Sequence, residues 1–174
     1  ALLARKGLYF ETTQEELTVV PGAPIAYWIS PKVRRAFISH SLIGDKVSLR
    51  QGLATGENDL FLRLWHEVSV TKFGTSVEDW PTAKSSGKKW FPHNKGGGYR
   101  KWYGNHDWVI AFDQKHRDLL KNLGNHLPSE AFYFKPCISW SLISGKSPAF
   151  RYVPTGSIIG HKGPGLFGDE KELQ

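Results

Sequence analysis

The sequence of 174 residues has no methionine and a single cysteine, Cys137. A lone cysteine can form no internal disulfide and cannot by itself build a zinc site, which excludes a disulfide-stapled secreted scaffold and a zinc finger. No apolar run approaches the roughly 18 residues of a transmembrane helix. The N-terminal ALLARKGLYF has too short an apolar stretch for a signal peptide and lacks a cleavage site. We therefore expect a cytoplasmic protein with no membrane partner.

Because the chain starts on Ala1 and lacks methionine, we expect it to be part of a longer protein. Its hydrophobic fraction of 40% and charged fraction of 22% are those of an ordinary globular protein. A mass of 19.6 kDa is enough for one well-formed core. One domain, or one domain with a small extension, is the expected organisation.

Acidic residues are absent from residues 81–106, PTAKSSGKKWFPHNKGGGYRKWYGNH, which we call the basic stretch. It contains six basic residues, whereas residues 1–80 carry nine basic and nine acidic side chains and residues 107–174 carry eight and seven. The net charge of +7 is therefore concentrated here. Five aromatic residues are interleaved with the cations: Trp90, Phe91, Tyr99, Trp102 and Tyr103. Flat rings that stack on bases, together with cations that meet phosphates, indicate a nucleic-acid surface. The alternative is a solvated basic loop whose aromatics belong to the core.

Helical signals are short and few. Thr12 or Thr13, followed by two glutamates, predicts the N-cap of a brief helix that ends at Pro21. Two short helices joined at Pro31 are expected over residues 24–39, another is expected to begin near Ser76, and one of about ten residues is expected over 113–123. The final residues, 168–174, resemble a first helical turn.

Alternating and β-branched patterns predict several strands. We expect strands at about 8–11, 46–53, 60–71, 136–142, 149–153, 157–160 and 165–167. Within the basic stretch, residues 89–91 and 99–103 are expected to be strands on either side of a tip at residues 94–98, with residues 107–112 completing an aromatic hairpin. The fold class is therefore α+β, a mixed, mostly antiparallel β-sheet with a few short helices. Trp28, Trp65, Trp108 and Trp140 are expected to be buried.

The residues needed for catalysis or metal binding do not come together in the sequence. No histidine stands four residues from another on a predicted helix, and no paired carboxylate lies near one, so no metal site is predicted. The acids that precede Lys115 and Lys171 lack the upstream acid of a nuclease centre. Cys137, next to Pro136 in an apolar strand, is expected to be a small core residue. We predict no catalytic residue.

Four ordered blocks carry a resemblance to a known family. They are PGAPIAYWISPKVRRAF, RQGLATGENDLFLRLWHEV, GKKWFPHNKGGGYRKWYGN and FYFKPCISWSLISGKSPAFRYVPTGSIIGHKGPGLF. Together they resemble the PglX-type adenine-specific DNA methyltransferases of BREX phage-defence systems, which belong to a wider group that includes type II restriction enzyme methylases. The resemblance covers nearly the whole chain.

The resemblance implies a target-recognition domain without its catalytic partner. In that family an upstream domain binds S-adenosylmethionine and carries an Asn-Pro-Pro-Tyr motif, but neither Asn-Pro-Pro nor the glycine-rich cofactor loop occurs here. The matching region begins with the Gly-x-x-Thr-Gly-x-Asn block, Gly52 to Asn58. It implies that residues 1–44 are a helical linker from the catalytic domain, and that residues 45–174 are a DNA-specificity domain, truncated at its end. The fragment is expected to hold no cofactor, and its enzymatic activity stays open.

The implied partners are double-stranded DNA and the upstream methyltransferase domain of the same parent chain. A base inside a duplex must be extruded for methylation, so a recognition domain has to grip the backbone and read neighbouring base edges. Phosphate contacts are predicted for Lys88, Lys89, Lys95, Arg100 and Lys101, and base-edge contacts for Gln51, Asn58, Asn94 and Asn105 and for Arg50 or Arg100. Tyr99, Trp102 and Tyr103 are candidates for stacking. Thr55, which belongs to the Gly52–Asn58 block that we call the recognition block, is also predicted to bind DNA.

Two other functions remain compatible with the sequence. A stand-alone module for single-stranded nucleic acid or RNA would use the same basic and aromatic hairpin. A protein-interaction domain would leave its lysines merely solvated.

Overall fold

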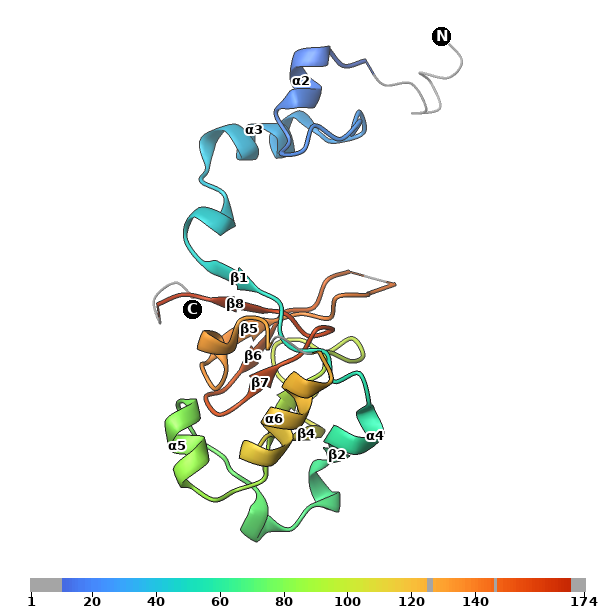
Figure 1. Cartoon of the computed structure of the whole chain (residues 1–174). Coiled ribbons are helices and arrows are strands. Elements are labelled where there is room, and N and C mark those ends of the chain that lie inside the picture. The colour runs from blue at the N-terminus through green and yellow to red at the C-terminus, as the bar shows by residue number, and fades with distance from the viewer. Residues whose placement is uncertain (1–10, 125–126, 146, 170–174) are drawn as a thin grey trace. The chain divides into compact units, whose positions relative to one another are not determined.

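The computed structural model describes residues 11–124, 127–145 and 147–169 (Figure 1). The chain divides into two compact units, residues 1–46 and residues 47–174. We describe each unit by itself. The predicted roles of residues 1–44 as a linker and of residues 45–174 as a recognition domain stay predictions.

Three short helical elements lie in the described part of the first unit, residues 11–46. Helix α2, Gln14–Thr18, begins with the predicted cap: the Glu16 N–H donates to Thr13 Oγ1 at 3.3 Å, and the Thr13 N–H donates to Glu16 Oε2 at 3.1 Å. Helix α3, Pro31–Ser39, is capped by Ser30, and the 3-10 helix η1 covers Ile43–Asp45. An ion pair of 2.7 Å joins Arg34 on α3 to Glu16 on α2.

One of the two helices predicted between residues 24 and 39 does not form. Residues 24–30 form a loop with a turn and a bend at residues 27–29, so that prediction is wrong. The chain enters the segment with Gly22 and Ala23 both at positive φ. Trp28 is 61% exposed, which contradicts its predicted burial.

The second unit is built on two four-stranded sheets. The first has the order β1-β8-β5-β6, all antiparallel, with β1 at Ser48–Arg50, β5 at Cys137–Ser139, β6 at Arg151–Val153 and β8 at Gly165–Phe167. The second has the order β2-β4-β3-β7, with β2 at Leu62–Leu64, β3 at Trp90–Asn94, β4 at Trp108–Ala111 and β7 at Ile158–Ile159. Among the strand pairs of the described residues, only β3 and β7 run parallel. Two mostly antiparallel sheets with a few short helices confirm the α+β class.

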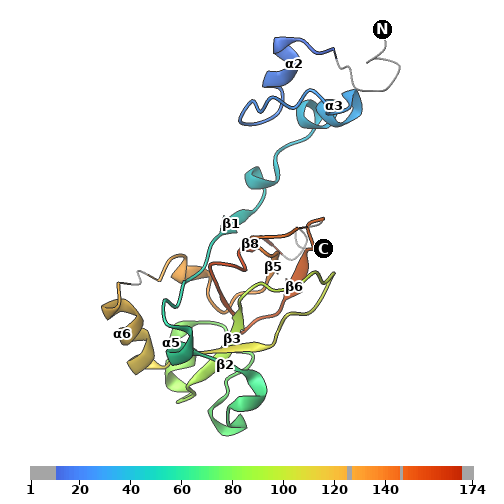
Figure 2. The same ribbon diagram turned by 90° about the vertical axis from the view of Figure 1, so that its right-hand side faces the viewer.

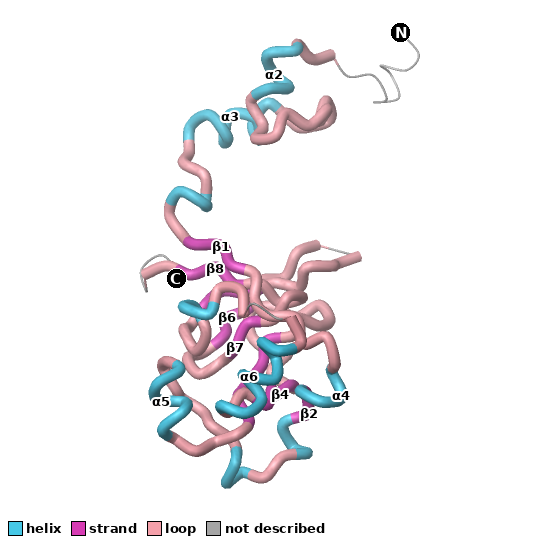
Figure 3. Tube along the Cα trace, in the orientation of Figure 1, coloured by secondary structure: helices cyan, strands magenta, loops and turns pink. Residues whose placement is uncertain are grey.

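Figures 1 and 2 show the first sheet toward one end of this unit and the second sheet, with its helices, toward the other. The helices are α4, Asn58–Phe61; α5, Trp80–Ser85; and α6, Gln114–Asn122. The 3-10 helices are η2, Trp65–Glu67; η3, Val70–Lys72; and η4, Glu130–Phe132. Loops connect these short elements over much of the trace (Figure 3).

A cluster of aromatic rings lies at the centre of the core. The rings of Phe91 and Phe134 meet edge to face at 5.5 Å, and Phe112 approaches Phe134 at 6.3 Å and Trp80 at 5.5 Å. The Phe134 backbone has a positive φ of 69°, which the Phe134 N–H stabilises by donating to Ser157 O at 2.8 Å. Offset and edge-to-face ring pairs add stability beyond their buried area.

The predicted positions of the strands are confirmed in the C-terminal half of the chain and are wrong for residues 60–71 and 99–103. Strands β5 to β8 lie inside the four predicted ranges, and α6 with its Asp113 cap matches the predicted helix. Residues 60–71 form a helix end, a three-residue strand and two 3-10 turns rather than one strand, and Trp65 is 55% exposed. The helix expected near Ser76 begins instead after Asp79, whose carboxylate accepts from the Thr82 N–H at 2.8 Å.

Trp108 and Trp140 are half-buried, and Trp108 packs against the core cluster. The predicted strand at 8–11 falls mainly on residues outside the described range. The same holds for most of the helical turn predicted at 168–174.

The hairpin of the basic stretch has a different second strand from the predicted one. Strand β3 pairs with β4, with Phe91 opposite Ile110, and residues 99–103 form no strand apart from an isolated bridge between Trp102 and Arg151. The apolar run Val109–Ala111 is fully buried, whereas residues 99–103 are exposed. Burial of the apolar run therefore outweighs the alternation of residues 99–103.

A close backbone contact fixes where β1 leads into the core. A Cβ atom on Gly52 would lie 1.9 Å from the carbonyl oxygen of Ile159. We expect Gly52→Ala to lower the free energy of unfolding by about 2 kcal/mol or more, because the obstruction is backbone that cannot move aside. Urea denaturation followed by tryptophan fluorescence measures this change.

The matched control is Gly98→Ala, where a Cβ atom meets nothing within 4 Å. This variant should stay within about 0.5 kcal/mol of the parent. Equal effects of the two substitutions would show that the contact at Gly52 does not constrain the fold.

Candidate nucleic-acid interface

Strand β3 divides the basic stretch into two separate groups of cations. Lys84, Lys88 and Lys89 precede the strand, and Lys95, Arg100 and Lys101 follow it. A strand rises about 3.3 Å per residue, so the backbones of Lys88 and Lys95 lie on the order of 20 Å apart. The stretch that is continuous in sequence therefore does not form one continuous charged surface.

The second group belongs to residues 95–107, the connection between β3 and β4, which we call the basic loop. Tyr99 is 56% exposed, Trp102 70% and Tyr103 63%. Arg100 and Lys101 are also exposed. The alternative in which the aromatics of the basic stretch are core residues is therefore wrong for these three rings. It holds for Phe91, which is fully buried.

Several hydrogen bonds hold the exposed basic loop to the first sheet. The Tyr152 N–H donates to Trp102 O at 2.8 Å, and Ser141 Oγ donates to Gly97 O at 2.7 Å. In Figure 2 the yellow-green segment after β3 runs up to β6 and returns to β4. Across the loop, the Asn105 side-chain amide donates to Gly98 O at 2.9 Å. The aromatic and basic side chains thus project from a backbone that is fixed at several points.

Arg151 is the side chain that sequence reasoning missed here. It is 2% exposed, and its guanidinium donates to Arg100 O at 3.4 Å, to Ala149 O at 3.2 Å and to Ser141 Oγ at 3.1 Å. Within the described part of the chain, no carboxylate lies within salt-bridge distance of it. Burial lowers the pKa of Arg151. Its only sequence signal was a basic residue in a predicted strand.

Two of the predicted base readers use their amides inside the protein. Asn94 is 4% exposed, and its Nδ2 donates to Ser139 Oγ at 2.5 Å and to Gly163 O at 3.0 Å. Asn105 is 9% exposed and bonds within the basic loop. Both are asparagines that the sequence placed beside glycine-rich turns, where a side-chain amide often satisfies backbone groups instead of a ligand.

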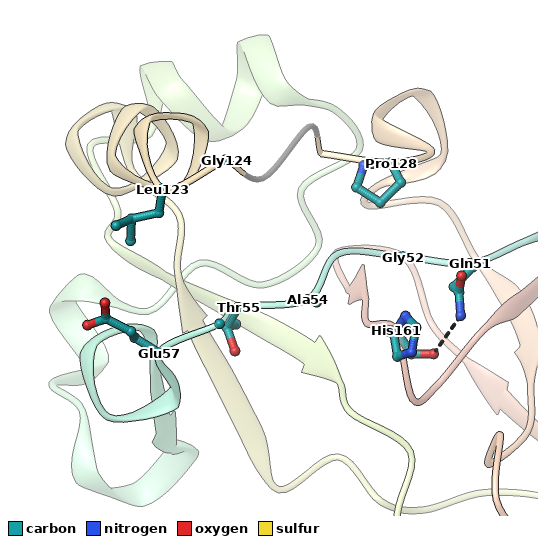
Figure 4. Close-up of a pocket in the computed structure, with 10 residues that line it drawn as sticks. Gln51, Gly52, Ala54, Thr55, Glu57, Leu123, Gly124, Pro128 and His161 are labelled. Carbon is teal, nitrogen blue, oxygen red and sulfur yellow. Dashed lines mark hydrogen bonds between the residues drawn. The ribbon is translucent and has the colours of Figure 1, made fainter.

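The recognition block lines a pocket of about 460 Å³, shown in Figure 4. The exposed Gln51 donates from Nε2 to His161 O at 3.5 Å, and Thr55 Oγ1 donates to Asn58 Oδ1 at 2.5 Å. Thr55 is buried at 9% exposure, whereas Asn58 is exposed. Arg50, also exposed, holds its guanidinium 4.8 Å from the Phe132 ring centre.

The remaining predicted phosphate contacts are half-buried lysines. Lys88 Nζ donates to Thr71 O at 2.8 Å, and Lys89 Nζ lies 4.8 Å from the Trp90 ring centre. Lys95 Nζ lies 4.0 Å over Trp108. Burial lowers the pKa of Lys95, and the positive charge of Lys162 lowers it further.

The described residues contain no group of three His, Cys, Asp or Glu side chains placed to hold a metal ion. Cys137 is fully buried, as predicted for a core residue, and burial raises the pKa of its thiol to about 12. In the part of the chain that the structure describes, no helix is long and apolar enough to cross a membrane.

Two curated relatives align with nearly the whole chain. An adenine-specific methyltransferase PglX from Lacticaseibacillus casei (strain Zhang) is 36% identical over 169 residues, which cover 92% of this chain and 14% of the relative. An adenine-specific methyltransferase BrxX from Escherichia coli O9:H4 (strain HS) is 33% identical over 172 residues, which cover 98% and 13%. This chain is homologous to a segment of the PglX-type adenine-specific methyltransferases. No family model matches it.

One histidine of this PglX-type segment is buried beside the candidate interface. His93, on β3, is 4% exposed, and its Nδ1–H donates to Ile158 O at 3.1 Å. This bond assigns the neutral tautomer with the proton on Nδ1. Burial lowers the pKa of His93 to about 4, and the nearby charge of Lys95 acts in the same direction.

The buried His93 predicts a loss of stability in mild acid. Its folded pKa of about 4 lies below the ordinary value of 6.5, so the unfolded chain binds the proton more readily between these two pH values. The stability from His93 is complete above pH 6.5 and falls as the pH drops toward 4, by about 3 kcal/mol. Urea denaturation at several pH values measures this loss.

The comparison is with His93→Gln, whose amide can also donate to Ile158 O but does not titrate. The stability of this variant should depend less on pH in that window than the stability of the parent. Two parallel pH profiles would show that His93 is not the titrating group.

Proposed function

We propose that this chain is the DNA-recognition part of an adenine-specific (N6) DNA methyltransferase of a phage-defence or restriction-modification system. It holds duplex DNA in position while a catalytic domain of the same protein binds S-adenosylmethionine and methylates the extruded adenine. The observation that carries the proposal is the basic loop, where exposed cations and aromatic rings project from a fixed backbone. The reaction is that of the two relatives, both of which are adenine-specific methyltransferases.

The arrangement of charge supports a polyanionic partner. Arg100 and Lys101 are exposed on the basic loop, which has no acid before Asp107 at its end. Buried Arg151 adds a third positive charge beneath them without a neighbouring carboxylate among the described residues. A local field of one sign attracts phosphates and releases their counterions.

In the proposal, bases are read by side chains that are exposed to solvent. Gln51 and Asn58 offer exposed amides suited to adenine edges, and Arg50 and Arg100 offer exposed guanidinium groups suited to guanine. Trp102 and Tyr103 are exposed rings that can stack or wedge against bases. In this proposal Asn94 and Asn105 support the fold instead of reading bases.

The proposal assigns methyl transfer to residues outside this chain. The sequence has neither an Asn-Pro-Pro motif nor the glycine-rich cofactor loop, so the proposal assigns S-adenosylmethionine binding to the catalytic domain as well. A recognition domain contributes affinity and register, which are separable from the methyl-transfer step.

The double substitution Arg100→Ala/Lys101→Ala tests the basic loop. We expect it to weaken binding to a 20-base-pair duplex and to lower the dependence of log K on log salt concentration by about 2, because about 0.9 is lost per phosphate contact. Fluorescence anisotropy at several salt concentrations measures both quantities.

The charge-matched control is Lys115→Ala/Lys121→Ala, which removes two exposed lysines from α6. The control should leave the slope nearly unchanged. The proposal would fail if both pairs had the same effect, if the chain bound no DNA, or if it bound heparin as tightly as duplex. The last two results would favour the protein-interaction and non-specific alternatives.

Trp102→Ala separates duplex recognition from single-strand binding. Under the proposal, the chain binds the duplex more tightly than either of its single strands, and Trp102→Ala weakens duplex binding less than the loss of Arg100 and Lys101. A single-strand module would show the reverse preference, with Trp102→Ala costing about 1–3 kcal/mol of single-strand affinity. The same anisotropy assay with the separated strands decides between them.

A further inference from the structure

A second, smaller cavity lies between the recognition block and the turn that follows β7. Its volume is about 180 Å³, which is room for several water-sized groups. Residues 54–56 and Asn58 line one side, residues 160–162 line another, and His93 and Lys95 contribute from the end of β3. The three segments are far apart in the sequence, and of the residues lining this cavity the sequence analysis connected only Thr55, Asn58 and Lys95 with DNA.

The charge of this cavity is of one sign. Lys95 and Lys162 both line it, and no Asp or Glu does. Burial is the largest cause that lowers the pKa of Lys95, and the positive charge of Lys162 is the second. Asp59, which does not line the cavity, raises the pKa of Lys95. Two cationic residues that share a cavity lining without an Asp or Glu favour an anion that contacts both.

The two lysines are held there by backbone that cannot easily rearrange. The Gly160 N–H donates to Asn94 O at 2.9 Å, and Asn94 Nδ2 donates to Gly163 O at 3.0 Å. A Cβ atom on Gly160 or Gly163 would lie 2.8 or 2.7 Å from Asn94 O. The residues that precede and follow the lysines are therefore locked to one another, so the site is preorganised.

Asn58 supplies a neutral donor to the same cavity. Its Oδ1 already accepts from Thr55 Oγ1 at 2.5 Å, so the group it offers to a ligand is its NH₂. Neutral His93 has its proton on Nδ1, committed to Ile158 O, and adds no charge. The polar residues that line the cavity and can meet a ligand are thus Lys95, whose Nζ also lies 4.0 Å over the Trp108 ring, together with Lys162, Asn58 and the exposed His161.

We propose that this cavity binds a phosphate group, with Lys95 and Lys162 as its cationic ligands and Asn58 as a hydrogen-bond donor. The source is a backbone phosphate of the bound DNA, and this assignment rests on the proposed function. Lys162 is then a DNA contact that lies outside the basic stretch. A phosphate anchored beside the recognition block fixes the register in which accessible side chains such as Gln51 meet base edges.

Lys162→Gln is the main test, because Lys162 is exposed and its loss should not disturb the core. One phosphate contact contributes a salt slope of about 0.9, which corresponds to an affinity loss of about eightfold at 0.1 M salt. Duplex binding by Lys162→Gln should show both changes, and Lys95→Gln/Lys162→Gln should lose more. Lys121→Gln, an exposed lysine on α6, is the control. Thermal unfolding of each variant confirms that it is folded.

A second arm asks whether free phosphate occupies the cavity. The thermal midpoints of the parent and of Lys162→Gln are measured with inorganic phosphate and with chloride at equal ionic strength. If Lys162→Gln binds DNA like Lys121→Gln and phosphate stabilises only the parent, the cavity binds free phosphate and the DNA assignment is overturned. If neither arm responds to Lys162→Gln, the whole proposal is overturned.

These experiments also distinguish a failure of the cavity proposal from a failure of the proposed function. Unchanged binding by Lys162→Gln alongside a large loss in Arg100→Ala/Lys101→Ala would overturn the cavity proposal and leave the recognition role intact. No DNA binding by the parent chain would overturn the recognition role, and the phosphate arm would still report on the cavity.

Discussion

The buried amide of Asn94 is the interaction on which the second unit depends. It stands at the end of β3 in one sheet and donates both to Ser139 Oγ on β5 in the other sheet and to Gly163 O in the turn between β7 and β8. The backbone carbonyl oxygen of Asn94 accepts from the Gly160 N–H. A buried amide without these partners would cost several kcal/mol, so the two sheets and the turn are constrained together. Close packing explains why glycine occupies positions 160 and 163.

This constraint has an electrostatic consequence. The residue after Asn94 and the residue before Gly163 are both lysines, so the bonds that join the sheets also bring two positive charges together. Arg151 shows the same tendency, since its buried guanidinium meets carbonyl and hydroxyl oxygens rather than a carboxylate. Desolvated cations without counterions are costly in a folded protein. A polyanionic ligand would offset that cost, which connects the packing of this unit to the proposed role in binding DNA.

The sequence predicted correctly those helix caps and strands that depend on residues close together in the chain. The Thr13 cap could be predicted because a capping side chain and its backbone partner lie three residues apart. The C-terminal strands could be predicted from the sequence because turn residues separate them. Residues 60–71 and 99–103 alternate equally well, yet they are not long strands, since pairing depends on which segment can be buried against β3. Within the candidate site, the composition of the basic stretch predicted the group of aromatic residues. It did not predict that the Asn94 amide bonds inside the protein, or that Arg151 and Lys162 lie beside the site.

The sequence by itself determined the class of fold, the concentration of positive charge in one acid-free stretch and the homology to PglX-type methyltransferases, because each depends on composition or on local order. Only the tertiary structure decided which of those cations lie together. Strand β3 separates Lys88 and Lys89 from Lys95, and the bonds of Asn94 bring Lys95 close to Lys162 from a distant turn. Charge adds up in space and not along the chain, so the site is set by the hydrogen bonds and close-packed glycines that join the two sheets.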